Sequence, residues 1–161
     1  MVLKLLAAGA LAVASRRRNS VENQVGRSFL PGSIDDMELA PAPIEPSWII
    51  AGDPQARLCE HSKSADGASV TALWDCTAGT FRWYFGWDET VVILEGEVHV
   101  TAEDGSEKVL RTGDIAYFTA GSWATWHVEN YVRKVAFVRK PFPGLMVAAM
   151  TQASFCPAPK L

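Results

Sequence analysis

The sequence predicts an all-β protein, built as an antiparallel sandwich or barrel. Between residues 47 and 140, short runs rich in Val, Ile, Thr and aromatic residues alternate with turn residues such as Gly, Asp and Asn. No segment of this region keeps the 3.6-residue spacing of apolar side chains that predicts a helix of useful length. The 161 residues, 48% of them hydrophobic, are enough for one domain with a core of its own.

Residues 1–46 are predicted to form an N-terminal arm and a linker. An apolar run from Leu5 to Ala14 stands before three arginines at positions 16–18. This pattern leaves four interpretations open, namely a short signal peptide, a helix on an anionic membrane surface through residues 1–18, docking on a neighbouring subunit, or a segment that frays. The four prolines of residues 31–46 predict an extended connection to the barrel.

The predicted barrel spans residues 47–140. Asp104-Gly105 predicts a hairpin turn, and we expect further turns at residues 77–79 and 129–130. The tail, residues 141–161, contains four prolines and is expected to pack one short apolar element on the barrel. The expected strands are residues 47–50, 69–76, 80–85, 90–96, 97–103, 107–111, 115–120, 123–128 and 131–138.

Charge and cysteine content restrict the partners and the compartment. The net charge of −3 and the lack of a clustered basic face in the barrel predict no nucleic-acid partner. The three cysteines include no Cys-x-x-Cys pair, which favours reduced thiols and a cytoplasmic location. The N-terminal run nevertheless leaves membrane association or export open, although no segment reaches the roughly 18 apolar residues of a membrane span.

Three segments carry a resemblance to a known family. They read WDCTAGTFRWYFGWDETVVILEGEVHVT, TGDIAYFTAGSWATWHV and YVRKVAFV, and together they cover roughly residues 70–140. They resemble the cupin superfamily and, more narrowly, the small cupin family related to the ureidoglycine aminohydrolase cupin domain. The resemblance implies a jelly-roll barrel of two antiparallel sheets, a ligand site inside the barrel, and commonly a homodimer.

The first half of the metal-binding cupin motif is only partly present. In that motif two histidines, separated by one residue, precede a glutamate and then a glycine. Glu89 and Gly96 match the end of the motif. The two histidine positions fall on Trp83 and Phe85, or on Arg82 and Tyr84.

The second half of the motif lacks its histidine as well, because that position is Ala124. His127 lies three residues further on, and side chains at an odd spacing on a strand point to opposite faces. A single carboxylate rarely holds a transition metal. The sequence therefore predicts no bound metal and no cofactor.

The candidate site centres on Glu89. Among Trp83, Phe85 and Trp126 its carboxyl group would lie in apolar surroundings, which favour a general acid or base. The alternative is a structural glutamate that is satisfied by hydrogen bonds. The three aromatic residues are predicted to line a pocket for a planar or apolar ligand, and packing in the core is their alternative role.

Polar groups are expected to complete the ligand site. Tyr117 is a candidate for a hydroxyl in the pocket, and Arg82 for binding an anionic group. Arg133 and Lys134 are neighbours on one strand, so at most one of them points inward. Either one alone is expected to be a solvated surface charge.

Three functions remain open at the level of sequence. The first is a metal-free barrel that binds a small molecule in an aromatic pocket. The second is an enzyme resembling ureidoglycine aminohydrolase that acts on a small nitrogen-rich metabolite. The third is a dimeric scaffold that is tethered through its N-terminal arm. The missing histidines favour the first.

Overall fold

The structure is a computed structural model that describes residues 28–147. The predicted membrane contact of residues 1–18, Cys156 and the end of the tail lie outside the described residues. Within the described part, residues 144–147 form one helical turn. None of the helices in residues 28–147 is long and apolar enough to cross a membrane.

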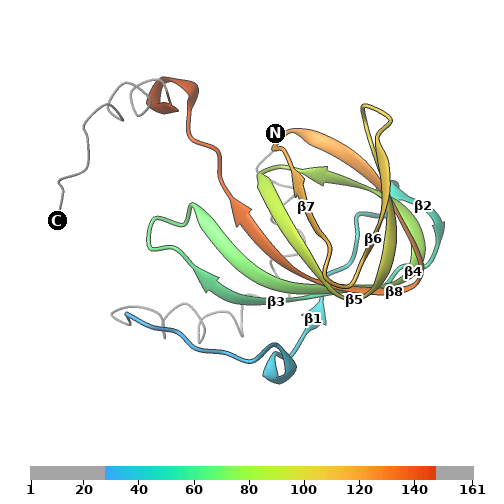
Figure 1. Ribbon diagram of the computed structural model, residues 1–161, viewed down its shortest axis with the longest axis horizontal. Coiled ribbons are helices and arrows are strands. Elements are labelled where there is room, and N and C mark those ends of the chain that lie inside the picture. The colour runs from blue at the N-terminus through green and yellow to red at the C-terminus, as the bar shows by residue number, and fades with distance from the viewer. Residues whose placement is uncertain (1–27, 148–161) are drawn as a thin grey trace.

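Antiparallel strands curl into a barrel (Figure 1), which confirms the predicted all-β, jelly-roll class. Two short 3-10 turns interrupt the arm, with η2 (Ile34–Asp36) before the first strand and η3 (Pro46–Trp48) between the first and second strands. The strands are β1 (Ala40–Pro41), β2 (Ile49–Gly52), β3 (Ala56–Lys63), β4 (Ser69–Phe85), β5 (Asp88–Ala102), β6 (Glu107–Arg111), β7 (Ile115–Phe118) and β8 (Ser122–Arg139).

The described strands belong to one hydrogen-bonded network rather than to two separate sheets. Their order is β1-β3-β4-β8-β5-β6, while β2 pairs with β4 and β7 pairs with β5. The long strand β8 pairs with β4 from Ser69↔Arg139 to Phe85↔Ser122. It also pairs with β5 over most of its length. These three strands therefore form the frame of the barrel, and the shorter strands extend it.

Two of the turns expected from the sequence are irregularities inside long strands. At residues 77–79 the register of β4 shifts against β8, but the chain continues as a strand. Thr77 accepts a hydrogen bond from the Gln55 backbone through its hydroxyl, at 2.9 Å. Residues 129–130 also lie within β8. The turns predicted there are wrong, because turn-forming residues also suit bulges, where the strand bends without reversing.

Strand β3 was not expected from the sequence. Its burial pattern does not alternate regularly, and its register with β4 shifts between Glu60 and Ser62. Pro54, a residue type common in turns, also lies just before this strand. Pairing along β4 stabilises this segment as a strand, although its own sequence pattern is weak.

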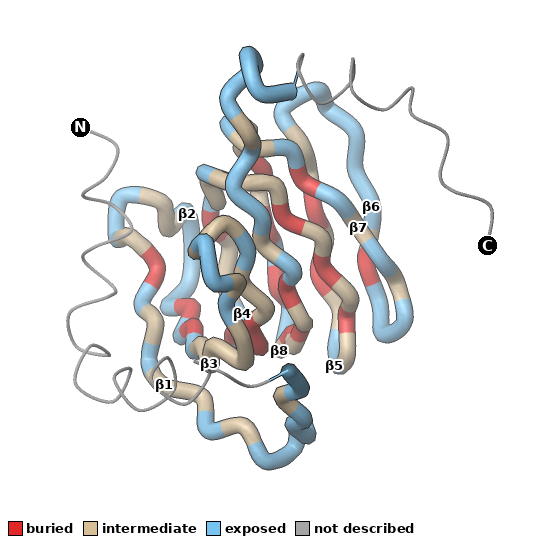
Figure 2. The backbone as a smooth tube through the Cα atoms, turned by 90° about the vertical axis from the view of Figure 1, so that its left-hand side faces the viewer, coloured by how far each residue is buried: buried red, intermediate tan, exposed pale blue. Residues whose placement is uncertain are grey.

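The core lies inside the barrel and is built from alternate residues of the long strands. On β5, Val91, Ile93 and Val98 are almost completely buried, while the residues between them are more exposed. Figure 2 shows buried positions recurring along β4, β5 and β8. This two-residue period places one face of each strand toward the core.

The described part of the N-terminal arm is attached to the barrel. β1 pairs with β3, within the segment predicted to be a linker. Further along the arm, the Arg133 guanidinium donates a hydrogen bond to the backbone oxygen of Ile34 at 2.7 Å. The buried carboxylate of Asp75 on β4 accepts hydrogen bonds from the Arg57 guanidinium on β3 and from the Tyr131 hydroxyl on β8.

Candidate functional site

A buried ion pair lies inside the barrel. The Lys134 ammonium on β8 donates a hydrogen bond to the Glu89 carboxylate on β5, with Nζ 2.5 Å from Oε1. The two residues are 4% and 9% exposed. Glu89 shares its face of β5 with Val91, and Lys134 shares its face of β8 with Val132 and Ala136, so the strand period turns both charges inward.

Two indole rings enclose the ammonium of this pair. Nζ of Lys134 lies 4.6 Å from the ring centroid of Trp126 and 5.0 Å from that of Trp74. A cation at this distance from an aromatic face is attracted by the ring quadrupole, and more strongly where water is excluded. The carboxylate and the rings together compensate the cost of burying the charge.

Trp126 also contributes a polar group that has no partner. The residue is 1% exposed, and its Nε1–H makes no hydrogen bond among the described residues. Buried polar groups are nearly always paired, and an exception calls for an explanation. The indole N–H therefore marks a position where an acceptor atom of a bound molecule would be stabilised.

Cys76 lies on the same strand as Trp74 and is completely buried. Burial raises the pKa of its thiol to about 12, and the charge of Asp75 adds to this effect while Lys134 opposes it. The thiol is therefore protonated at neutral pH. Because the thiolate is the reactive form, Cys76 is a small core residue rather than a nucleophile.

The three aromatic residues predicted for the pocket lie on the inner face of the barrel. Phe85 stacks on Phe118 with centroids 4.2 Å apart, and Trp126 lies 5.7 Å from Phe118. Trp83 is only partly buried and makes edge contacts with Trp48 and other rings. The aromatic side chains fill much of the interior, and Trp83 lies at its margin.

Arg82 and Tyr117 do not join Glu89. Arg82 is exposed, and its guanidinium stacks 4.6 Å from the ring centroid of Trp123. Tyr117 is 61% exposed on the outer face of β7. Arg82 follows the inward-pointing Phe81, and Tyr117 precedes the inward-pointing Phe118. Because successive side chains of a strand point to opposite faces, Arg82 and Tyr117 point outward. The two polar side chains that were predicted to complete the ligand site therefore lie on the surface instead.

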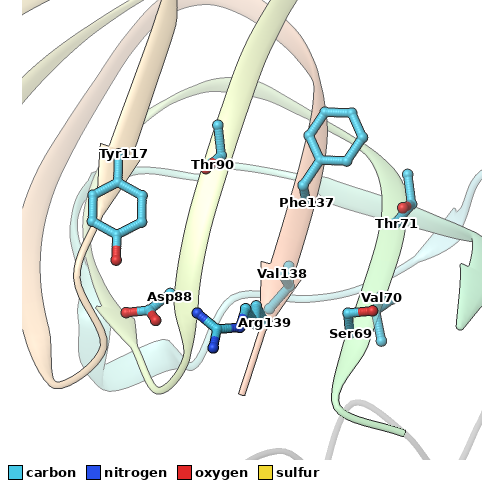
Figure 3. Close-up of a pocket in the computed structure, with 9 residues that line it drawn as sticks. All are labelled: Ser69, Val70, Thr71, Asp88, Thr90, Tyr117, Phe137, Val138 and Arg139. Carbon is cyan, nitrogen blue, oxygen red and sulfur yellow. The ribbon is translucent and has the colours of Figure 1, made fainter. Parts of the chain in front are cut away.

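Tyr117 instead lines a groove of about 320 Å³ on the outer face of the barrel (Figure 3). A hydrogen bond to Asp88 is the main cause that raises the pKa of the Tyr117 hydroxyl. Asp88 also accepts a hydrogen bond from the backbone of Ala120. The groove is lined by Ser69, Val70, Thr71, Asp88, Thr90, Tyr117, Phe137, Val138 and Arg139.

Lys134 is the site residue that the sequence analysis missed. It was expected to be a solvated charge, although at most one of Arg133 and Lys134 could point inward. The signal that identifies it is its position between Val132 and Ala136, two apolar residues at even spacing on the same strand. A lysine at this even spacing points to the same face of the strand as the two apolar residues, which is the inner face of the barrel.

The interior does not fit the metal that the cupin motif implies. Among the described residues, no group of three or more His, Cys, Asp or Glu side chains could hold an ion. The Glu89 carboxylate is bound by an ammonium group. His99 and His127 alternate with buried residues and lie on the outer face, where His99 contacts Glu107 and His127 contacts the Thr80 hydroxyl. The chemistry of the site therefore depends on the Lys134 ammonium, the Glu89 carboxylate and the aromatic rings around them.

Comparison with known proteins agrees with this architecture. Residues 63–136 match the family model of the EutQ-like cupin domain. The matched residues run from the end of β3 into β8, so this part of the chain is similar to the EutQ-like cupin domain. A search of curated proteins found no significant match to it.

Solved structures include barrels that are similar to this one. A DUF861 family protein of unknown function from Pseudomonas syringae is 28% identical, with a TM-score of 0.58 over 63% of this chain. The match spans 44% of that longer protein. A predicted oxalate decarboxylase from Thermotoga maritima is 11% identical, with a TM-score of 0.53 over 68% of this chain and 97% of its own, which shows the fold alone.

A putative ethanolamine utilisation protein from Salmonella typhimurium is 20% identical, with a TM-score of 0.49 over 67% of this chain and 98% of its own. None of these three names mentions ureidoglycine aminohydrolase. The narrower resemblance drawn from the sequence therefore stays a prediction.

Proposed function

We propose that the cupin domain binds a small organic molecule at Glu89, Lys134 and Trp126, without a metal ion. The observation that carries this proposal is an ion pair enclosed by aromatic rings beside an unpaired, buried indole N–H. The Lys134 ammonium supplies a positive charge where the complete metal-binding cupin motif would place a metal ion. The side chain of Glu89 is 12% exposed, so the ion pair is not sealed from solvent.

The donors in the cluster indicate the chemical class of the ligand. An ammonium group has three N–H donors, and Glu89 accepts one of them. The indole of Trp126 adds another donor. A ligand with a carboxylate or carbonyl oxygen would accept these hydrogen bonds, and the rings of Trp74 and Trp126 would contact its apolar part.

Energetic considerations also support a functional role for the ion pair. Well-packed apolar residues can often replace a buried ion pair without loss of stability. The barrel interior already contains many aromatic and aliphatic side chains, so the two charges are not needed to fill it. Their presence is therefore better explained by recognition of a polar ligand than by packing.

Native mass spectrometry of the full chain, followed by tryptophan fluorescence titration with acetate, glyoxylate and pyruvate, tests the proposal. We expect at least one of these probes to bind and to change the emission of the buried indoles. Glu89→Gln and Lys134→Met should weaken binding at least about tenfold, which corresponds to the net energy of one charged hydrogen bond. Lys108→Met, an exposed lysine on β6, is the matched control. Equal binding by all variants would remove the cluster from the site.

A second candidate is an enzyme that acts on a small nitrogen-rich metabolite, with Glu89 as general acid or base. The contact between Glu89 and Lys134 favours this candidate, because it joins a proton donor and an acceptor inside the barrel. Ammonia release from ureido compounds, abolished by Glu89→Gln, is the expected result. A wild-type protein that releases no ammonia from a broad panel would exclude this activity.

The outer groove supports pairing with a second copy of the chain. Tyr117 and Phe137 line the groove with Asp88 and Arg139 and are 61% and 48% exposed, and Ile115 on the same strand as Tyr117 is 67% exposed. A two-fold symmetric contact would bring Asp88 of one copy to Arg139 of the other and cover the apolar residues. The tethered scaffold remains a separate hypothesis, tested by deletion of residues 1–18 and membrane fractionation.

A further inference from the structure

We propose that Lys134 is the nucleophile of a covalent site, and that it condenses reversibly with an aldehyde or ketone ligand to form an imine. This inference rests on the proposed binding function and extends it. Lys134 is an inward-pointing lysine enclosed by apolar and aromatic residues, and within residues 28–147 its one polar contact is Glu89. Lysines in such surroundings serve as imine-forming residues when a neighbouring group can take up their proton.

The ion pair provides the proton transfer that the reaction needs. Nζ of Lys134 and Oε1 of Glu89 are already in hydrogen-bond contact at 2.5 Å. Passage of one proton to the carboxylate leaves a neutral amine with a free electron pair. Glu89 then holds this proton beside the reacting nitrogen until the leaving oxygen requires it.

The bond changes follow in order. The amine attacks the carbonyl carbon, a C–N bond forms, and the carbonyl electron pair moves to oxygen, which receives a proton from the nitrogen. The resulting carbinolamine hydroxyl accepts the proton held by Glu89 and leaves as water, while the nitrogen electron pair forms the C=N bond. The products are a protonated imine on Lys134, an ionised Glu89 and one water molecule, so atoms and charge balance.

The surrounding aromatic rings stabilise the cation both before the reaction, as the ammonium, and after it, as the protonated imine. The protonated imine carries the same single charge as the ammonium, so the faces of Trp74 and Trp126 attract it in the same way. The unpaired Nε1–H of Trp126 is available to donate to the carbinolamine oxygen.

Other nucleophiles in the described residues are less suited to the reaction. Cys76 is buried nearby as a protonated thiol. Lys63, Lys108 and Lys140 are exposed at the surface rather than enclosed by aromatic rings. These three lysines provide internal references for the reactivity of Lys134.

Reductive trapping tests the inference. The full chain is incubated with limiting glyoxylate or pyruvate and sodium cyanoborohydride at neutral pH, and the modified lysines are mapped by peptide mass spectrometry. We expect labelling of Lys134 to exceed that of each exposed lysine at least about tenfold, at the low end of what positioned proton transfer contributes. The preference should disappear when the chain is unfolded in urea.

Variants separate the parts of the proposal. Lys134→Arg should retain the charge and lose the adduct, and Glu89→Gln should slow labelling of Lys134 without changing that of Lys108. Labelling of Lys134 at or below the level of the exposed lysines in the folded wild-type protein would overturn the inference, and this result requires no variant to fold. If the fluorescence titration still shows binding in that case, the proposed non-covalent site stands. If neither binding nor labelling occurs, both proposals are wrong.

Discussion

At the scale of single residues, Glu89 and Lys134 bind each other inside the barrel and depend on each other for stability. Lys134→Met removes the cation and leaves a carboxylate that must be buried unpaired or protonated. We expect a loss of about 3–5 kcal/mol in the free energy of unfolding, the usual cost of breaking a buried ion pair. Urea denaturation at pH 7, followed by intrinsic fluorescence, measures this loss.

The double variant Glu89→Leu/Lys134→Met is the control for this prediction. Because it removes both charges, we expect it to recover most of the lost stability. Lys108→Met should leave the urea midpoint unchanged, since Lys108 is exposed. A Lys134→Met protein as stable as the wild type would show that Glu89 does not need its partner.

The sequence predicted the inward position of Glu89 but not its partner. Trp83, Phe85 and Trp126 were chosen because they map to or near the ligand positions of the cupin motif, and in the structure they lie on the inner face. Strand alternation turns Arg82 and Tyr117 outward once Phe81 and Phe118 are recognised as core residues. Lys134 was missed because a charged side chain is usually exposed, and that general tendency outweighed its regular spacing from Val132 and Ala136.

At the scale of elements, Gly96 controls how closely β5 approaches β8. It has a φ of +71°, and a Cβ atom at this position would lie 1.9 Å from the backbone oxygen of Tyr131. Gly96→Ala must therefore displace one of these strands. We expect a loss of more than the roughly 1–3 kcal/mol that the backbone conformation alone costs, measured by urea denaturation.

Gly113→Ala is the matched control, because Gly113 has a φ of +91° and no atom within 4 Å of the added Cβ. It should show the conformational cost without the clash. Equal losses in the two variants would mean that the contact with Tyr131 adds nothing.

Tyr131 joins β8 to β3 and β4 through Asp75. Burial, followed by the 2.8 Å hydrogen bond to Asp75, raises the pKa of the Tyr131 hydroxyl from 10.0 to about 12. The folded protein therefore holds this proton more tightly than the unfolded chain. The stability that Tyr131 contributes should be complete below pH 10 and should be lost as the pH rises to about 12.

Urea midpoints measured between pH 9 and pH 12 test this prediction. Tyr131→Phe should have a lower midpoint at neutral pH, because Asp75 loses a donor, and a smaller decline above pH 10 than the wild type. Cys76 also has its pKa raised to about 12, but it is present in both proteins and does not affect the difference. Parallel pH curves would show that Tyr131 is not the titrating group.

The element boundaries show where sequence patterns fail. Most barrel strands were expected, because their alternation of apolar residues reflects burial of one face. Residues 77–79 and 129–130 were expected to be turns, since the same residue types serve in turns and in bulges, and only pairing with the neighbouring strand decides between them. Strand β3 shows the reverse case, in which pairing along β4 forms a strand from a segment with a weak pattern.

At the scale of the whole molecule, the barrel leaves one outer region apolar while the arm covers another. Arg133 binds the arm at Ile34, and β1 extends the sheet beside β3. The groove keeps Tyr117 and Phe137 exposed together with Asp88 and Arg139, and Ile115 is exposed on the same strand as Tyr117. Such a patch beside charges of both signs is suited to a two-fold contact with a second copy.

Light scattering coupled to size-exclusion chromatography measures this assembly. We expect the full chain to have the mass of a dimer at micromolar concentration, and Phe137→Glu to convert it into a monomer, because a buried carboxylate without a partner opposes the contact. Ile50→Glu is the matched control, since Ile50 is 58% exposed on β2 and does not line the groove. It should remain dimeric. A monomeric wild type would refute the contact, and dissociation of both variants would place it elsewhere on the surface.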